Sequence, residues 1–333
     1  MERKIVILGN ATDWCQKSLN DINKYDNIKL LNSNYLCDLN KIQQFLIKIQ
    51  FSYKLNHIFN VPLKRIWFKK VRKNISLDKN DNLLIIVYDR SFLSQNEKFI
   101  KYLRNYYKNC KIVYLFTNIV KYSGAKEYNF VEKLNKVYDL VYAFDYEDAK
   151  KYNFKYNPLI YSENEIKDNK KNVDVFYVGK AKDRYDMLIK CFEKINKIKL
   201  KAEFYIFGIN EKKQKYNDQI KYNQYIPYVE CLENIKASNC LLDIIQGDSS
   251  GYTIKVCEAI FYNKLLITTN KNIKNAPFYN PKYILIIENE NDIKREFFDS
   301  KDDVKYTESD RKYFLLNTFL MKINNDLKEG KIK

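Results

Sequence analysis

The string DIIQGDSSGYTIKVCEAI (243–260) has the residue types and spacing of an anion-binding turn followed by a helix. A short apolar run enters a small polar loop, after which Thr253 can cap a helix that continues through Tyr262. Helix N-termini offer unpaired N–H groups and partial positive charge, and Gly251 has no side chain to keep a phosphate away. Glu258 follows Thr253 by about one and a half helical turns, where its carboxylate could accept hydrogen bonds from ribose hydroxyls. The pattern predicts a pyrophosphate cradle, and an ordinary helix cap remains the alternative.

This stretch resembles the donor-binding half of GT-B glycosyltransferases, particularly bacterial polysaccharide and lipopolysaccharide enzymes. In that half, a small-Gly-x-Thr-x-basic turn is followed by Glu-Ala-hydrophobic, as here from 250 to 260. The segment 174–195 resembles the first strand and helix of the same half, and 264–273 resembles its closing strand. The resemblance implies a nucleotide-diphosphate sugar as donor substrate and no cofactor. It assigns donor binding to Gly179, Lys180, Lys182, Arg184, Ser250, Gly251, Tyr252, Thr253, Lys255 and Glu258.

One position departs from the family pattern. Many retaining members carry an acidic residue eight positions before the ribose-binding Glu, where this chain has Ser250. The resemblance therefore leaves open whether the configuration at the anomeric carbon is retained or inverted. By the same resemblance, the segment 222–230 offers backbone contacts to the base near Ile226 and Pro227.

The elements that must position these residues are read from short apolar runs, separated by longer stretches with helical periodicity. Such runs are typical of buried parallel strands, and their alternation with helices predicts two doubly wound α/β units. We expect two Rossmann-like domains that face a cleft, with the ligand at the carboxyl ends of the strands. The expected strands are 4–9, 82–89, 111–117 and 139–145 in the first unit, and 174–179, 202–208, 239–245, 265–270 and 283–288 in the second.

The domain boundary is placed in a charged, Asn-rich segment without apolar periodicity. We assign residues 1–161 to an acceptor-binding domain, 162–172 to a linker and 173–308 to the donor-binding domain. Residues 309–333 hold an amphipathic helix, which can pack back on the N-terminal domain.

The N-terminal half contains few residues that indicate chemistry. Asp13 follows the first strand and is the candidate general base for an acceptor hydroxyl, with helix capping by Thr12 or Asp13 as the alternative. His57 is the only histidine, which argues against multi-histidine metal sites and His-based triads. The acidic string at 145–148 matches a DxD motif only loosely and is interpreted as the start of a helix. We therefore expect no catalytic metal.

The composition of the chain says something about its partners and its location in the cell. The formal charge of +18 attracts anionic partners, but the abundance of Lys, Asn, Tyr and Ile also fits an AT-rich coding sequence. The seven cysteines include no CxxC spacing, and no signal peptide or membrane span is predicted, so we expect a cytoplasmic protein. The segment 61–74 mixes basic and apolar residues, which leaves open attachment to the inner face of an anionic membrane or ordinary packing on the domain.

These features together predict a metal-independent glycosyltransferase that moves a hexosyl or related sugar to a hydroxyl of a cell-surface glycan or lipid-linked acceptor. Two alternatives stay open. A nucleotide-sugar epimerase has the same architecture, although one histidine argues against it. A basic nucleic-acid-binding protein would explain the charge, but the chain has no zinc, RRM or helix-turn-helix signature.

Overall fold

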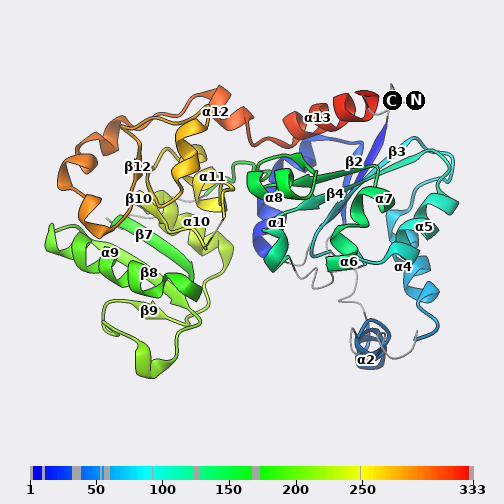
Figure 1. The fold of residues 1–333 in the computed structure, drawn as a ribbon, viewed down its shortest axis with the longest axis horizontal. Coiled ribbons are helices and arrows are strands. Elements are labelled where there is room, and N and C mark those ends of the chain that lie inside the picture. The colour runs from blue at the N-terminus through cyan, green and yellow to red at the C-terminus, as the bar shows by residue number, and fades with distance from the viewer. Residues whose placement is uncertain are drawn as a thin grey trace.

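The protein is described by a computed structural model with two α/β lobes, joined where the chain passes from one parallel sheet to the other (Figure 1). The structure describes residues 3–9, 12–31, 39–52, 55, 61–91, 93–123, 128–166, 173–247 and 249–329.

The N-terminal lobe is built on a parallel sheet with the strand order β2-β1-β3-β4-β5-β6. Its strands are β1 (Lys4–Leu8), β2 (Ile28–Leu31), β3 (Leu83–Tyr88), β4 (Cys110–Phe116), β5 (Leu140–Ala143) and β6 (Lys155–Tyr156). Its α-helices are α1 (Asp13–Ser18), α2 (Lys41–Gln50), α4 (Arg65–Ile75), α5 (Glu97–Tyr106), α6 (Tyr128–Val131), α7 (Leu134–Val137) and α8 (Tyr146–Lys151), with 3₁₀ segments η1 (Asn20–Lys24) and η3 (Val120–Tyr122).

The C-terminal lobe repeats this plan with the order β12-β11-β10-β7-β8-β9. Its strands are β7 (Val173–Lys180), β8 (Ala202–Phe207), β9 (Lys221–Tyr222), β10 (Ser238–Asp243), β11 (Leu265–Thr268) and β12 (Ile284–Ile286). Its α-helices are α9 (Tyr185–Lys197), α10 (Tyr228–Ala237) and α11 (Ile254–Phe261), with 3₁₀ segments η4 (Lys182–Arg184), η5 (Glu211–Lys213), η6 (Lys271–Asn275), η7 (Glu290–Asp292) and η8 (Arg295–Asp303).

Both sheets are parallel, and the helices that connect parallel strands cover both faces of a sheet. Strands in such a sheet are buried on both faces, which accounts for their continuous apolar runs. Every residue of β3 is buried, for example. The expected pair of doubly wound units is confirmed. Strands β2, β6 and β9 were not expected from the sequence, since they are short and only partly buried.

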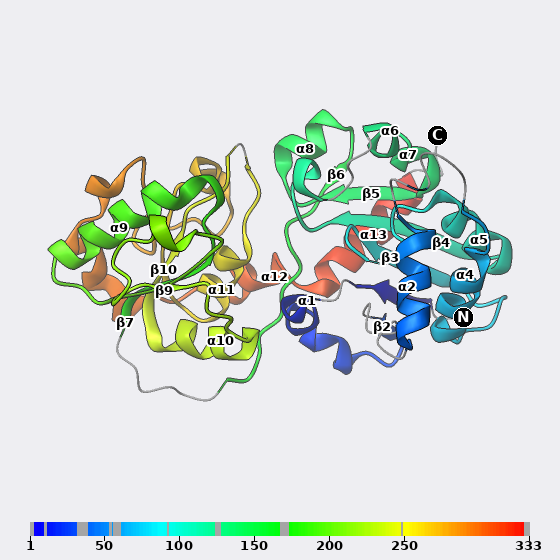
Figure 2. The same ribbon diagram turned by 90° about the horizontal axis from the view of Figure 1, so that it is seen from below.

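The end of the chain returns to the N-terminal lobe, as both views of the ribbon show (Figure 1 and Figure 2). The single helix expected after residue 308 is two helices, α12 (Glu308–Lys312) and α13 (Leu316–Glu329). Between them Phe314 is buried in the C-terminal core, and its carbonyl accepts the Tyr161 N–H at 2.8 Å, so the chain bends where it crosses between the lobes. Helix α13 then buries one face in the N-terminal core through Leu316, Phe319, Leu320 and Ile323, which confirms that it packs back.

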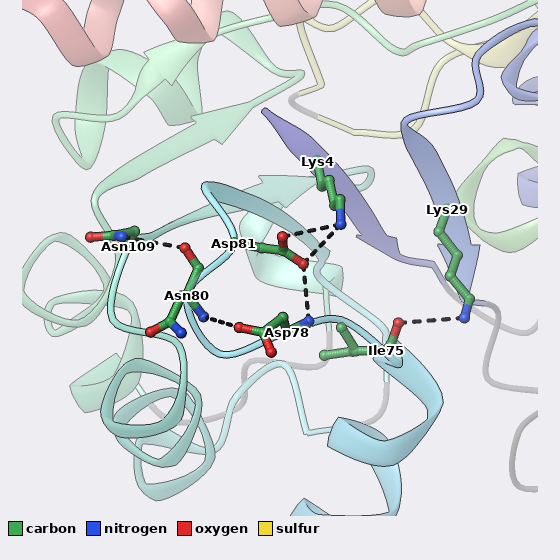
Figure 3. A network of polar contacts seen from close by, with 7 residues as sticks. All are labelled: Lys4, Lys29, Ile75, Asp78, Asn80, Asp81 and Asn109. Carbon is green, nitrogen blue, oxygen red and sulfur yellow. Dashed lines mark hydrogen bonds and ion pairs between the residues drawn. The ribbon is translucent and has the colours of Figure 1, made fainter. Parts of the chain in front are cut away.

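A polar network fixes the amino ends of the N-terminal strands (Figure 3). The Lys4 ammonium, at the start of β1, forms an ion pair of 3.0 Å with Asp81, in the turn before β3. Asp81 also accepts the Asp78 N–H at 2.9 Å, and Asp78 accepts the Asn80 N–H at 2.8 Å. Ligands of doubly wound folds bind at the carboxyl ends of the strands. These contacts lie at the opposite edge of the sheet, away from the expected site.

Among the described helices, none combines the length and the apolar character that crossing a bilayer requires.

Candidate functional site

The predicted turn lies at the carboxyl edge of the second sheet, between β10 and α11. Thr253 is the N-cap of α11: its hydroxyl oxygen accepts the Lys255 N–H at 3.2 Å and its hydroxyl donates to the buried Asp243 at 2.9 Å. The N–H groups of Tyr252, Thr253 and Ile254 have no acceptor among the residues that the structure describes. Three successive donors at a helix N-terminus are suited to bind a phosphate.

Gly179, near the end of β7, lies close to the Lys255 side chain, which follows the N-cap of α11. A Cβ on Gly179 would lie 3.7 Å from the Lys255 Nζ and 3.0 Å from the Tyr177 hydroxyl oxygen, so a larger residue there would press on the Tyr177 hydroxyl. The Lys255 ammonium lies over the Tyr177 ring at 5.1 Å. The Tyr177 hydroxyl is buried and lacks a hydrogen-bond partner in the described part of the chain. The sequence thus brings one cation and one unused hydroxyl to the edge of the turn.

Glu258 is buried on the same helix, with only 2% of its surface exposed. Burial raises the pKa of its carboxyl to about 7, and the positive charge of Lys255 partly opposes this rise. The Tyr228 hydroxyl, at the start of α10, donates to Glu258 Oε1 at 2.8 Å and lies 3.3 Å from the Tyr161 hydroxyl. A ribose that contacts Glu258 would therefore share its carboxylate with Tyr228 or displace that hydroxyl.

The segment 222–230 contacts Glu258 through the Tyr228 hydroxyl, at the start of α10. Pro227 is the N-cap of α10, and Ile226 is buried in the C-terminal core. Backbone contacts of this segment to a nucleotide base stay a prediction.

The three basic residues after β7 have different environments. The Lys180 side chain is exposed, and no described residue forms an ion pair with its ammonium. Lys182 has a left-handed backbone with φ of 49°, and its ammonium donates to Gln246 in the loop after β10. The Arg184 guanidinium donates to the backbone carbonyls of Ile244 at 2.7 Å and Ala181 at 3.3 Å. Arg184 therefore ties the turn after β7 to the loop after β10, while Lys180 and Lys182 are the cations nearer to solvent.

A further cation comes from the N-terminal lobe and was not expected from the sequence. Arg90 is the second residue after β3, and its guanidinium donates to the Tyr122 carbonyl at 2.6 Å. Lys182 lies over the Tyr122 ring at 5.1 Å. Burial lowers the pKa of Lys182, and the charges of Arg184 and Arg90 lower it further. Cations from both lobes therefore repel one another at this edge, and a bound anion would relieve that repulsion.

The loop before α11 contacts the N-terminal lobe closely. Asp145, after β5, accepts the N–H groups of Ser250 at 2.6 Å and Gly251 at 2.9 Å. A Cβ on Gly251 would lie 2.5 Å from the Phe144 ring and 2.8 Å from the Phe144 carbonyl oxygen. We expected the absent side chain of Gly251 to make room for a phosphate, but Phe144 fills that space. The N–H groups left for a phosphate are those that follow Gly251.

Asp13 lies between the lobes, as a general base for an acceptor would require. It is exposed in the first turn of α1, and its carboxylate accepts the Tyr225 hydroxyl at 2.9 Å. Neither Thr12 nor Asp13 makes the side-chain capping bond that the alternative requires: Thr12 is the N-cap of α1, without a side-chain cap hydrogen bond. The role of Asp13 as a general base stays a prediction.

Asp89, which also follows β3, was not expected as a candidate. Its Oδ1 accepts the Thr117 hydroxyl at 2.7 Å, whereas its Oδ2 is buried and unpartnered in the described part of the structure. Burial raises the pKa of its carboxyl to about 6. Asp89 is as deeply buried as Glu258, at 1% exposure, and it has no part in the function proposed below.

The other sequence candidates are distributed as follows. His57 lies outside the described residues. Asp145 caps α8, as the interpretation of 145–148 as a helix start requires, by accepting the Asp148 N–H at 3.1 Å. In the described part of the chain, no three His, Cys, Asp or Glu side chains gather as a metal site would need.

The basic segment 61–74 is only partly buried in the N-terminal core. Trp67, Phe68 and Val71 are buried, but Leu63 and Ile66 are 66% and 56% exposed. An open groove of about 710 Å³ runs between α4 and α5 and is lined by Val61, Pro62, Leu63, Lys64, Arg65, Ile66, Phe68, Lys98, Lys101, Tyr102, Asn105 and Tyr106. The packing alternative holds for one face of the helix, and the other face stays open to a partner.

Solved structures with both lobes arranged in this way are known. The chain is similar to an α-glucosyltransferase in complex with UDP-glucose and DNA containing an abasic site, at 12% identity over 98% of each chain with a TM-score of 0.55. It is also similar to sucrose-phosphate synthase from Thermosynechococcus elongatus, at 10% identity over 99% of each chain with a TM-score of 0.53. The chain has the GT-B fold.

The GT-B fold is not confined to one reaction. A protein of Listeria monocytogenes described as a UDP-N-acetylglucosamine 2-epimerase is also similar, at 8% identity over 98% of this chain and 96% of that one, with a TM-score of 0.50. No family model and no curated protein matches the sequence. The fold is shown by these similarities, and the reaction has to be argued from the site.

Proposed function

We propose that this GT-B protein is a glycosyltransferase that moves a sugar from a nucleotide-diphosphate donor to a hydroxyl of a glycan or lipid-linked acceptor. The observation that supports the donor best is the edge of the second sheet, where the N–H groups of residues 252–254 precede Lys255 and find no acceptor among the described residues. The arrangement can neutralise a diphosphate, which is the leaving group of such a transfer.

The other charged residues that the sequence predicts for the site have the following roles in this proposal. Lys180 and Lys182 neutralise the diphosphate from the other side of the turn, and Arg184 holds the backbone that carries them. Glu258 accepts hydrogen bonds from the ribose, and Asp13 removes the proton from the acceptor hydroxyl as the bond to the sugar forms. The charge that develops on the leaving diphosphate is met by the helix N-terminus and the cationic side chains.

Ligand-dependent thermal stability tests the donor. A ligand that binds only the native state raises the melting temperature, so sugars linked to UDP, GDP and CMP are screened one by one, with oligonucleotides as a further arm. The DNA in the α-glucosyltransferase structure gives the oligonucleotide arm its reason. Stabilisation by one nucleotide sugar and not by oligonucleotides supports the proposal. The absence of any shift with all nucleotides would reject it.

An epimerase is the second candidate, because it shares the fold and the donor. The two reactions differ in their need for an acceptor. A transferase releases the nucleoside diphosphate only when an acceptor hydroxyl is present, apart from slow hydrolysis, whereas an epimerase converts the nucleotide sugar alone. Analysis of the nucleotide products with and without a mixture of glycan acceptors separates the two.

We further propose that the exposed face of α4 meets an anionic membrane surface, which would bring the enzyme to a lipid-linked acceptor. Four cations surround the apolar groove, namely Lys64, Arg65, Lys98 and Lys101. Burial lowers the pKa of Lys64, and the charge of Lys98 lowers it further, so an anionic headgroup would relieve this repulsion. Sedimentation with vesicles that contain phosphatidylglycerol, but not with pure phosphatidylcholine vesicles, is expected. Lys98→Glu with Lys101→Glu should abolish it, and equal sedimentation of this variant would contradict the proposal.

A further inference from the structure

One carboxylate of the N-terminal lobe is devoted to the loop that precedes the donor helix. Asp145 is only 2% exposed and accepts five hydrogen bonds. The Asp148 N–H, at 3.1 Å, belongs to its own helix. The other four donors belong to the C-terminal lobe: Ser249 Oγ at 3.2 Å, Ser250 N at 2.6 Å, Ser250 Oγ at 2.9 Å and Gly251 N at 2.9 Å.

The saturation of this carboxylate decides what it can do. An ionised carboxyl has about four lone-pair sites, so five donors leave none for a substrate hydroxyl. Asp145 is therefore unsuited to act as a base or a nucleophile. Hydrogen bonds from neutral groups to a carboxylate are among the stronger ones in proteins, which suits a fixed joint between the lobes.

The geometry around the joint makes the loop conformation specific. Phe144 lies against Gly251 so closely that a methyl group would overlap its ring and its carbonyl. Asp145 takes the N–H groups of Ser250 and Gly251, and the next three N–H groups, of residues 252–254, are left without acceptors in the described part of the chain. The N-terminal lobe thus determines where the free donors of the turn point.

We propose that Asp145 is a positioning residue for the donor: it holds the loop 249–251 so that the N–H groups of 252–254 face the diphosphate. This role rests on the proposed function, because it needs a diphosphate ligand at α11. It also means that donor affinity depends on contact between the lobes, since the carboxylate and the loop belong to different ones.

Nucleotide affinity of Asp145→Ala tests the role, with calorimetric titration of UDP, GDP and CDP and of the corresponding nucleosides. Loss of the carboxylate frees the loop, and the diphosphate should bind about tenfold more weakly or worse, as loss of one charged hydrogen-bonding partner implies. The nucleoside, which lacks the phosphates, should bind with unchanged affinity. A variant that is merely less stable would lose both ligands in the same proportion.

Two variants keep the test decisive. In Asp145→Asn the amide oxygen can still accept the N–H groups of Ser250 and Gly251, so most of the diphosphate affinity should be restored. The NH₂ group then faces the Asp148 N–H, and two donors that face each other lower the stability. If Asp145→Ala does not fold, Asp145→Asn tests the role by a smaller loss of affinity, which should again concern the diphosphate and not the nucleoside; equal affinity for both ligands relative to the wild type would overturn it. Asp148→Ala is the matched control, because Asp148 lies in the same helix turn and accepts the Val120 N–H at 2.7 Å without touching the donor loop. It should lose stability and keep its nucleotide affinity.

The outcomes separate the two claims. If the wild type binds none of the nucleoside diphosphates, the proposed function falls and this role falls with it. If the wild type binds one of them and Asp145→Ala binds it equally well, only the positioning role is overturned. Equal weakening of nucleoside and nucleoside diphosphate also overturns it, because the effect would then not concern the phosphates.

Discussion

Replacing Glu258 by Gln should make the protein more stable and a poorer binder of nucleotides. The carboxyl is buried in an apolar core, where its charged form is unfavourable. Its pKa rises from the ordinary 4.5 to about 7 in the folded state, mainly through burial. Gln is uncharged at every pH and can still accept the Tyr228 hydroxyl, so the substitution removes the cost of the charge and keeps the hydrogen bond.

The size and the pH dependence of the gain follow from the pKa. Below about pH 4.5 the carboxyl is protonated in both the folded and the unfolded chain, and Gln gains little. Between about 4.5 and 7 the unfolded chain binds fewer protons than the folded one, so the free energy of unfolding of the wild type falls as pH rises. A pKa difference of one between the folded and unfolded states corresponds to about 1.4 kcal/mol. The rise from 4.5 to about 7 should therefore give Gln an advantage that approaches about 3 kcal/mol at pH 8.

Urea denaturation at pH 4.5, 6 and 8 measures this advantage. Glu230→Gln is the matched control, since Glu230 is exposed on the adjacent α10 and should show no such trend. Nucleotide titration of the same proteins completes the experiment: the nucleoside diphosphate should bind more weakly to Glu258→Gln, because the ribose loses a charged acceptor. A difference in stability that does not vary with pH would refute the burial argument. Greater stability with unchanged nucleotide affinity would instead leave Glu258 without its proposed contact to the ribose.

Three further predictions concern residues around the site. Gly251→Ala should lower the free energy of unfolding by about 1–3 kcal/mol in urea denaturation, because its methyl group would overlap Phe144, and an unchanged midpoint would contradict the close contact. Arg90→Ala should weaken nucleoside diphosphate binding about tenfold in calorimetric titration without changing stability, and an unchanged affinity would remove Arg90 from the site. Asp89→Asn should raise the free energy of unfolding by up to about 3 kcal/mol at pH 8 and hardly at pH 3.5, because burial raises the folded-state pKa of the Asp89 carboxyl from 3.8 to about 6. The amide oxygen of Asn can still accept the Thr117 hydroxyl. An equal effect at both pH values would contradict the prediction.

Local features of the fold could be predicted well from the sequence. Apolar runs such as 83–88 are buried on both faces of a sheet, and burial of this kind leaves a continuous pattern that can be recognised without a structure. The helix cap at Thr253 was predictable for a similar reason, because capping is decided by residues two or three positions apart. Strand β6 has two residues and no apolar run, so its pairing with β5 depends on the surrounding chain.

The parts of the site that depend on distant residues could not be predicted. Asp145 follows a strand and begins a helix, and both properties are visible in the sequence. Its contact with Ser250 joins positions 105 residues apart, and no local pattern encodes it. The same holds for Arg90, which was one basic residue among many until the structure placed it near Lys182. Arg184 shows the reverse case, because its charge suggested a phosphate ligand and its guanidinium instead binds backbone carbonyls.

The absent acidic residue at position 250 has a different meaning in three dimensions. The sequence has Ser250 where many retaining GT-B glycosyltransferases, by the resemblance described above, carry a carboxylate. The Asp145 carboxylate nevertheless lies 2.9 Å from the Ser250 hydroxyl oxygen. Negative charge is therefore present at this point of the loop, supplied by the other lobe. Because that carboxylate is saturated by five donors, it cannot also contact a sugar, so its presence does not argue for retention. It does bind the donor loop to the N-terminal lobe. A donor that binds at α11 consequently meets a loop whose shape is determined by both lobes, and this dependence on the joint is the property that the Asp145 variants measure.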